Sequence, residues 1–257
     1  MPDDRARLAL ARLGHRLFGG ADGPEPFVSV LIPTWNRAAL LAERTVPTVL
    51  AQSYRRFEVV VVGDGCTDDT AARLRALGDE RVRFFNLPER GRYPEDPLLR
   101  WMVAGTAPLN RALELARGRW FAYIDDDDTW EPDHLASMLE HARATGAEFV
   151  YGAMDFQRAP AEWLRLGAWP PGTGRIPHSA TLYRSYLRFL RYDLEAWRVG
   201  VGVDSLMWGR MLDAGVRFSF LDRVVAASPL RPGQDLQGQG AAERAQREYA
   251  SAQGGAG

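Results

Sequence analysis

The chain has 257 residues, of which 46% are hydrophobic and 25% are charged. This length and composition suit one large α/β domain, or two small domains that share a cleft. The 32 basic and 33 acidic residues leave a formal net charge of −1, so the chain has no net positive field to hold a nucleic acid. Its single cysteine, Cys66, excludes an intrachain disulfide framework and a cysteine-based zinc site, and it favours a reducing, cytoplasmic location. All 32 basic residues are arginine, which excludes a P-loop lysine and a pyridoxal-phosphate Schiff base.

Residues 1–23 are predicted to form an N-terminal helical extension that ends in a glycine- and proline-rich stretch. One helical face carries Leu10, Leu13 and Leu17, and another carries Arg5, Arg12 and Arg16. Two interpretations follow. The pattern favours a helix that packs on the domain, because apolar helix faces are usually turned toward a core. The alternative is a peripheral contact of residues 1–18 with an anionic membrane, at its inner face.

From residue 27 the sequence alternates between short apolar runs and helical patterns. Strands are predicted at 27–32, 57–62, 81–85, 120–124 and 148–151, and helices at 37–52, with a kink at Pro47, and at 69–77, 105–116, 132–145 and 204–214. This order predicts an α/β fold with a mostly parallel sheet flanked by helices. Ligands of such sheets bind beyond the carboxyl ends of the strands. Residues 159–178 are expected to be a loop or lid, and the chain beyond about 235 is expected to be disordered.

Four consecutive carboxylates, Asp125 to Asp128, follow the predicted strand 120–124. Alternation along an extended chain places Asp125 and Asp127 on the same side. Two carboxylates on one side suit a hard cation, and Mg²⁺ or Mn²⁺ is the expected cofactor. A solvated acidic turn that caps the next helix is the alternative interpretation.

Two other strand ends carry residues that suit a nucleotide. Asp64 lies between two glycines after the second strand, and its carboxylate can accept a hydrogen bond from the N3–H of uracil or thymine. Trp35, after the first strand, offers a π-face on which a base could stack. The alternatives are a turn aspartate bonded to its own backbone and a core tryptophan.

Taken in order, these blocks resemble the inverting glycosyltransferases of family 2, which have the GT-A fold. The resemblance rests on residues 29–37, 52–54, 57–70, 110–118 and 123–133. It is strong over 27–136 and weaker over 137–215. It implies a Rossmann-like GT-A domain at 24–230, with a nucleotide-binding half at 24–128 and a less regular acceptor-binding half at 129–230. Residues 231–257 would be a flexible tail.

The resemblance also implies roles for individual residues. The nucleotide would be bound by Pro33, Thr34, Trp35, Asn36, Asp64, Asp125 and Asp126. Asp127 would be the main metal ligand, together with Asp125. Two departures from the family pattern bear on donor binding: Gly63 stands where a first carboxylate is common, and Cys66 stands where a serine is common.

The catalytic base is expected in the second half of the chain. An inverting transfer needs a carboxylate that takes the proton of the acceptor hydroxyl. Asp204, at the start of a predicted helix, matches the family position for this base. A plain helix cap is the alternative. Arg100 and His178 are further candidates for contacts with diphosphate or acceptor, although surface and structural roles are equally compatible with the sequence.

The expected reaction is transfer of a sugar from a UDP- or dTDP-sugar to a hydroxyl of a glycan, lipid-linked or small-molecule acceptor. Two other functions stay open. A sugar nucleotidylyltransferase has a related sheet but usually carries an arginine- and lysine-containing glycine-rich loop after the first strand, where this chain has residues 33–36. A non-catalytic nucleotide-sugar-binding protein would bind the donor without consuming it.

Overall fold

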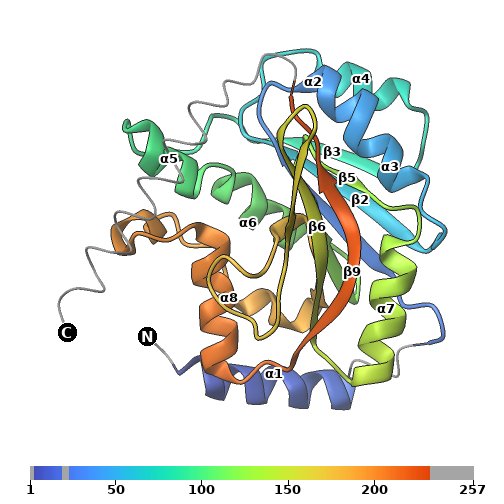
Figure 1. The fold of residues 1–257 in the computed structure, drawn as a ribbon, viewed down its shortest axis with the longest axis vertical. Coiled ribbons are helices and arrows are strands. Elements are labelled where there is room, and N and C mark those ends of the chain that lie inside the picture. Colours follow the sequence, from blue (N-terminus) through green and yellow to red (C-terminus); the bar gives the residue numbers. More distant parts are fainter. Residues whose placement is uncertain (1–2, 19–22, 232–257) are drawn as a thin grey trace.

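The computed structural model describes residues 3–18 and 23–231, which form one mixed sheet with helices on both faces (Figure 1). The strands, in the order in which they lie across the sheet, are β3 (Val82–Asn86), β2 (Phe57–Gly63), β1 (Val28–Thr34), β4 (Trp120–Tyr123), β8 (Thr181–Arg184), β6 (Phe149–Ala159), β9 (Phe218–Ser228) and β5 (Thr129–Trp130). A further strand, β7 (Glu162–Leu166), pairs with β6. Strands β3, β2, β1 and β4 are parallel, and β8 is antiparallel to both of its neighbours. The expected mostly parallel α/β sheet is confirmed.

The helices cover the two faces of this sheet. They are α1 (Asp4–Phe18), α2 (Ala38–Leu40), α3 (Val46–Leu50), α4 (Thr70–Ala76), α5 (Pro97–Val103), α6 (Thr106–Leu115), α7 (His134–Thr145) and α8 (Val203–Ala214). Between α2 and α3 the chain forms a π-helical turn at Leu41–Thr45. The irregularity expected at Pro47 therefore lies just before it, because proline has no N–H to donate to the preceding turn.

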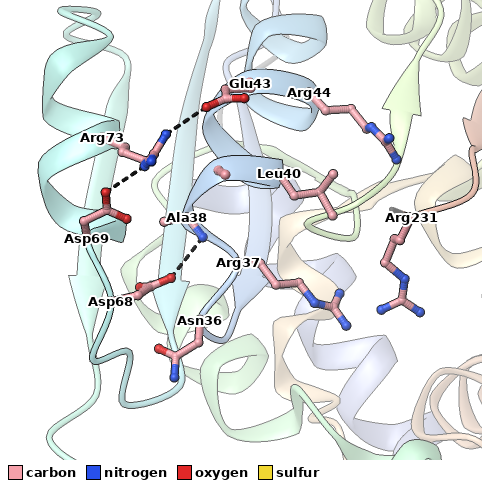
Figure 2. Close-up of a pocket in the computed structure, with 11 residues that line it drawn as sticks. Asn36, Arg37, Ala38, Leu40, Glu43, Arg44, Asp68, Asp69, Arg73 and Arg231 are labelled. Carbon is pink, nitrogen blue, oxygen red and sulfur yellow. Dashed lines mark hydrogen bonds and ion pairs between the residues drawn. The ribbon is translucent and has the colours of Figure 1, made fainter. Parts of the chain in front are cut away.

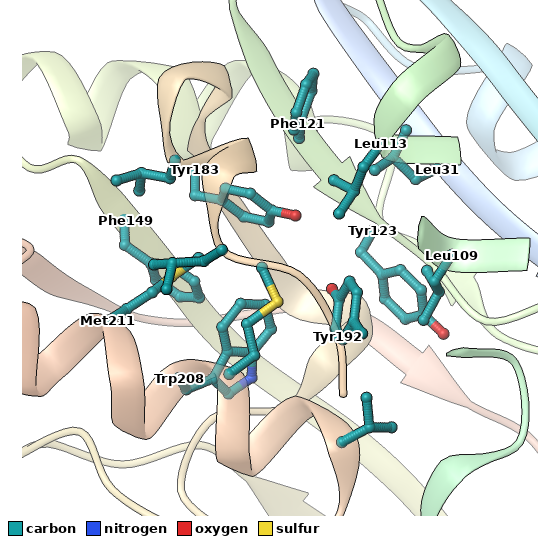
Figure 3. Close-up of a cluster of buried hydrophobic side chains, with 14 of the residues drawn as sticks. Leu31, Leu109, Leu113, Phe121, Tyr123, Phe149, Tyr183, Tyr192, Trp208 and Met211 are labelled. Carbon is teal, nitrogen blue, oxygen red and sulfur yellow. The ribbon is translucent and has the colours of Figure 1, made fainter. Parts of the chain in front are cut away.

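The core consists of two apolar layers, one on each side of the sheet. Strands β1 and β2 are buried along their whole length, which is typical of parallel strands covered on both faces. Alternate residues enter different layers: Leu31 packs with α6 and α8, whereas Val30 packs with α3 and α7. The first layer is rich in aromatic rings, including Phe149, Tyr183 and Trp208 (Figure 3).

The second half of the chain is more regular than its sequence indicates. The segment 159–178, expected to be a loop or lid, contains β7, which folds back on β6 as a hairpin. Strands β8 and β9 and helix α5 were also not expected. Helix α5 and β9 are only partly buried, and β8, although buried, has four residues, so none of them shows the long apolar run that identifies β1 and β2. Most of the tail expected at 231–257 lies outside the described residues.

Helix α1 packs on the domain, but not through the face that the sequence indicates. Leu8 is its buried residue, and it joins the layer formed by α6 and α8. The leucine face is turned outward instead, with Leu10 67%, Leu13 49% and Leu17 63% exposed. Polar contacts hold the other side of the helix, and the main one joins Arg12 to Glu148.

Glu148 is a buried carboxylate just before β6. Its two oxygens accept hydrogen bonds from Arg12, at 2.7 and 2.5 Å, from the Tyr186 hydroxyl at 2.6 Å and from the Arg217 backbone N–H at 2.9 Å. Burial alone would raise the pKa of Glu148, but these donors outweigh burial and lower it. Glu148 therefore links α1 to the amino ends of the strands at this edge of the sheet.

We expect Glu148→Ala to lower the free energy of unfolding by about 3–5 kcal/mol, because it removes the carboxylate that Arg12, the Tyr186 hydroxyl and the Arg217 N–H share. Urea unfolding monitored by circular dichroism measures this change. Glu43→Ala is the matched control, since Glu43 also pairs with an arginine but is exposed, and its loss should change stability little.

The same carboxylate should give the wild type an acid-labile component of stability. A carboxyl with a lowered pKa in the folded state stabilises the fold above its unfolded pKa, and this contribution is lost as the pH falls through the folded value. Between pH 6 and pH 3, the wild type should therefore lose more stability than Glu148→Gln does. Parallel pH profiles for the two proteins would contradict this role of Glu148.

Candidate active site at the carboxyl ends of the strands

The four carboxylates after β4 alternate between buried and accessible positions. Asp126 and Asp128 are 6% and 3% exposed, whereas Asp125 and Asp127 are partly exposed. This agrees with the prediction that Asp125 and Asp127 lie on one side. The buried pair is anchored by neighbouring elements. Asp126 accepts a hydrogen bond from Thr34 at 2.7 Å, and Asp128 accepts one from Ser179 at 2.5 Å.

The accessible pair has different neighbours. Asp125 accepts a hydrogen bond from the Tyr123 hydroxyl, and its backbone N–H donates to Ser179 at 3.0 Å. Asp127 pairs with two arginines, with Arg37 Nη1 at 3.3 Å and with Arg231 Nε at 3.0 Å. Arg37 also contacts Asp126 at 2.6 Å.

Burial and mutual repulsion raise the pKa values of Asp125, Asp126 and Asp128. The pKa of Asp125 rises to about 7, through burial first and the charge of Asp127 second. Burial also raises the pKa of Asp126, although Arg37 opposes it, and raises that of Asp128 well above its usual value. The cluster therefore favours any added positive charge, whether a proton, a guanidinium or a metal ion.

The two accessible carboxylates, Asp125 and Asp127, are of the type that a hard divalent cation prefers. Among residues 3–18 and 23–231, no group of three or more aspartate, glutamate, histidine or cysteine side chains is arranged to hold a metal. The pair Asp125 and Asp127 instead fits a cation such as Mg²⁺, which proteins commonly hold through one or two carboxylates while water and substrate phosphates supply the other ligands.

A pocket of about 740 Å³ lies beside Asp127, around the start of α2. Four arginines line it: Arg37, Arg44, Arg73 and Arg231. In Figure 2, Arg37 and Arg231 extend into the same region, whereas Arg73 is turned toward Glu43 and Asp69, with which it pairs. Arg37 and Arg231 thus line this pocket while they pair with Asp126 and Asp127, so an arginine-rich surface adjoins the acidic cluster.

The turn predicted to hold a base presents one aromatic face. Pro33 and Thr34 belong to β1 and are buried. Asn36, with a positive φ of 50°, exchanges two hydrogen bonds with Thr67 and so braces the turn after β2. Trp35 is 42% exposed and faces outward.

Residues 90–93 cover both predicted base contacts. The guanidinium carbon of Arg90 lies 3.4 Å from the centre of the Trp35 ring. Asp64 is buried and accepts hydrogen bonds from the Gly91 backbone N–H at 2.8 Å and the Tyr93 hydroxyl at 2.7 Å. Arg90 Nε is itself buried and has no hydrogen-bond partner among the described residues. A planar ligand would therefore have to enter between Arg90 and Trp35.

Asp204 lies in the first turn of α8, and burial raises its pKa. Burial and the neighbouring Tyr183 raise the pKa of Tyr192, and the charges of Asp204 and Asp125 add to this. The last turn of α8 contacts α1 through the Asp213 backbone oxygen, so the first turn, with Asp204, points toward the opposite end of the sheet. Figure 3 shows Tyr192 between Tyr123 and Trp208. The fold thus brings the predicted base and the acidic cluster to the same end of the sheet.

Comparison with known proteins identifies the family. A family model described as "Glycosyltransferase like family 2" matches residues 24–203. The chain belongs to glycosyltransferase family 2. The succinoglycan biosynthesis protein ExoO of Rhizobium meliloti is 36% identical over 141 residues, which are 55% of this chain and 37% of that protein. The chain spans less than half the length of the curated relatives that it matches first.

Solved structures of glycosyltransferases share the fold. Staphylococcus aureus TarS in complex with UDP-GlcNAc has a TM-score of 0.63 at 19% identity, over 82% of this chain and 60% of that chain. The mannosyltransferase PcManGT from Pyrobaculum calidifontis, in complex with GDP-Man and Mn²⁺, has a TM-score of 0.62 at 19% identity, over 93% of this chain and 68% of that chain. These likenesses confirm the expected GT-A fold.

Two further predicted contact residues of this family 2 member, His178 and Arg100, have partners within the protein. His178 stacks on Tyr123 with ring centres 3.3 Å apart, and its Nε2 lies 3.0 Å from the Tyr192 hydroxyl. Burial lowers the pKa of His178 to about 3, so the ring is neutral. Arg100 binds the backbone oxygens of Pro94 and Glu95. In this structure it therefore braces the segment before α5.

Sequence reasoning gave no role to two arginines that contact the acidic cluster, Arg37 and Arg231. Arg37 directly follows the predicted turn, so its position after β1 was a usable signal. Arg90 lies in the segment 88–104, whose arginines Arg90, Arg92 and Arg100 were all candidates for a diphosphate contact. Nothing in the sequence pointed to Arg231, which lies more than 100 residues beyond its partner Asp127.

The fit of residues 89–91 over Asp64 can be tested at Gly65. This glycine has a φ of +66°, and an added Cβ would lie 2.5 Å from the Arg90 backbone nitrogen. Gly78 has the same φ of +66° but no atom within 4 Å of its added Cβ. We expect Gly65→Ala to destabilise the protein by about 1–3 kcal/mol more than Gly78→Ala does, because only the first adds a steric clash. Thermal unfolding of both variants measures the difference, and equal losses would mean that residues 89–91 do not pack here.

Proposed function

We propose that this chain catalyses inverting transfer of a sugar from a nucleoside-diphosphate donor, UDP- or dTDP-linked, to an acceptor hydroxyl. The observation that carries the proposal is the convergence of Trp35, Asp64, the acidic cluster and Asp204 at the carboxyl ends of the strands. Ligands of open α/β sheets bind at this edge. Membership of glycosyltransferase family 2 supports the reaction class. The two structural neighbours were solved with UDP-GlcNAc and with GDP-Man, and they support a nucleotide-sugar donor.

The base of the donor would enter between Trp35 and Arg90. Both flat groups can stack on a nucleobase, and Arg90 already occupies the face of the Trp35 ring. Asp64 has accepting capacity left, because an ionised carboxylate offers about four lone-pair sites and two are in use. It would accept the N3–H of a uracil or thymine ring.

Asp127, together with Asp125, would hold Mg²⁺ or Mn²⁺. When bound, the cation would neutralise the charge that develops on the leaving diphosphate. Mn²⁺ in the structure of PcManGT supports this cofactor. Arg37 and Arg231, which now pair with Asp127, would be available to the donor phosphates, since arginine suits bidentate phosphate contacts.

Asp204 would take the proton of the acceptor hydroxyl as that oxygen attacks the anomeric carbon. Its raised pKa makes it a stronger base than an exposed aspartate. His178 and Tyr192 bond each other beside Tyr123, which contacts Asp125, and both are neutral, so they would add no charge there.

Calorimetric titration with UDP, dTDP and GDP, each with and without Mn²⁺, tests the donor class. We expect binding of UDP or dTDP that requires the cation. Binding of GDP alone would contradict the base assignment, and no binding of any nucleotide would contradict the proposal. Product analysis separates the alternatives. A nucleotidylyltransferase releases pyrophosphate rather than a nucleoside diphosphate, and a non-catalytic binder does not turn the donor over, not even by slow hydrolysis.

Asp204→Asn should keep nucleotide binding but lower the rate of transfer or donor hydrolysis by about 10²- to 10⁴-fold, the usual contribution of a general base. Asp193→Asn, also in the second half of the chain, is the control and should keep its activity. In the wild type, the rate should rise with pH as Asp204 ionises. Because burial raises the pKa of Asp204, this rise should occur at a higher pH than for an exposed aspartate. Full activity of Asp204→Asn would move the base elsewhere.

Arg231→Gln should tighten Mn²⁺ binding by roughly two- to five-fold. Arg231 and the cation would compete for Asp127, and a partly exposed ion pair is worth up to about 1 kcal/mol. Arg223→Gln removes a comparable pair with Asp133 away from the cluster and serves as the control. Isothermal titration with Mn²⁺ alone measures both affinities. Weaker binding to Arg231→Gln would show that the cation does not share Asp127 with this arginine.

A further inference from the structure

We propose that the outward face of α1 is a peripheral contact site for an anionic membrane surface. This face carries Leu10, Leu13 and Leu17, which are 67%, 49% and 63% exposed, and it ends near Phe18, which is 87% exposed. The spacing of the three leucines places them along one side of the helix. They form a continuous apolar stripe, called here the leucine stripe, and exposed alanines at positions 6 and 9 extend it.

Polar contacts with the body of the protein fix the direction of this stripe. Asp4 pairs with Arg210 at 3.0 Å, Arg5 donates to the Asp213 backbone oxygen at 2.9 Å, Arg7 donates to the Phe189 backbone oxygen at 3.0 Å, and Arg12 pairs with Glu148 at 2.5 Å. Turning the stripe inward would break all four contacts and would uncover the buried Leu8. The apolar side therefore faces solvent because the charged side is required by the domain.

The charges beside the stripe indicate its partner. Arg5 and Arg16 are exposed and lie on the same flank of the stripe. Asp4, one of the two acidic residues at the start of the helix, pairs with Arg210, so its charge is balanced within the protein. Leucines with a phenylalanine on one face and arginines at its edge are typical of helices that lie in the interface of a bilayer, where the arginines reach anionic headgroups. A second copy of the same face would bring arginines toward arginines, which disfavours self-association.

The length of α1 suits a helix that lies flat on a bilayer. No helix in the described part of the chain is long and apolar enough to cross a membrane. Helix α1 has 15 residues, or about 22 Å of length, and would lie flat with its leucines in the headgroup region.

The contact would leave the candidate active site open. Helix α1 is tied to Glu148, just before β6, whereas the acidic cluster follows β4. Strands β4 and β6 run in the same direction, because each is antiparallel to β8. The stripe and the cluster therefore lie at opposite ends of the sheet, with α1 at the bottom and α2 at the top of Figure 1. On a membrane, the candidate active site would therefore face the aqueous phase. This inference does not depend on the proposed reaction.

Vesicle sedimentation of the full chain tests the site. The probes are vesicles of phosphatidylcholine alone and of phosphatidylcholine with about one third phosphatidylglycerol. We expect the wild type to pellet with the anionic vesicles, less so in high salt, because added salt screens the arginines. Leu13→Ser with Leu17→Ser should lower the partition coefficient at least ten-fold. Leu164→Ser, which alters an exposed leucine of β7, is the control and should bind as the wild type does.

Circular dichroism and thermal unfolding check that the double variant keeps its fold, as expected for exposed positions. Arg16→Gln should bind anionic vesicles more weakly, and its binding should depend less on the lipid charge; Arg5 stays unchanged because it also bonds the Asp213 backbone oxygen. Three results would each overturn the proposal: no pelleting of the wild type, equal pelleting of the double leucine variant, or a dimer in analytical ultracentrifugation that the leucine substitutions convert to a monomer.

Discussion

Four consecutive carboxylates at the end of a buried strand are the constraint on which this site depends. Carboxylates so close together in a buried environment cannot all remain ionised without positive charge between them. The protein meets this requirement with hydroxyl donors beneath the cluster and guanidinium groups above it. Thr34 and Ser179 hold Asp126 and Asp128, whereas Arg37 and Arg231 approach from the solvent side. Asp125 and Asp127 are thereby left accessible, with a demand for positive charge that a divalent cation would satisfy.

The surrounding elements can be understood as supports for this cluster. Thr34 ends β1, and its backbone oxygen accepts the Asp64 N–H, so the ends of β1 and β2 are joined next to the acidic turn. His178 stacks on Tyr123, whose hydroxyl reaches Asp125, and Tyr192 completes the wall toward α8. These side chains are neutral, so they add no charge beside Asp125. The same groups therefore serve both packing and the chemistry proposed here.

Much of the first half could be predicted from local pattern. Strands β1 and β2 are continuous apolar runs, and the residues that follow each run must meet at one edge of a parallel sheet. The pattern predicts that Trp35, Asp64 and Asp125 to Asp128 lie together, because the direction of parallel strands fixes where their ends lie. The strands β7, β8 and β9 were not predicted, because β7 and β9 are largely exposed or partly buried and β8, although buried, is only four residues long, so none shows a long apolar run.

The sequence by itself determined the α/β class, the strand ends that carry the site and, through its ordered motifs, the family. Only the tertiary structure decided which side chains face each other there. Arg90 lies on Trp35, Tyr93 on Asp64 and Arg231 on Asp127, and each of these contacts joins segments tens to more than 100 residues apart. Tertiary structure also decided the direction of α1. Hydrophobic periodicity shows that a helix has an apolar face, but the buried charge of Glu148 required Arg12, and so the leucines were turned to solvent.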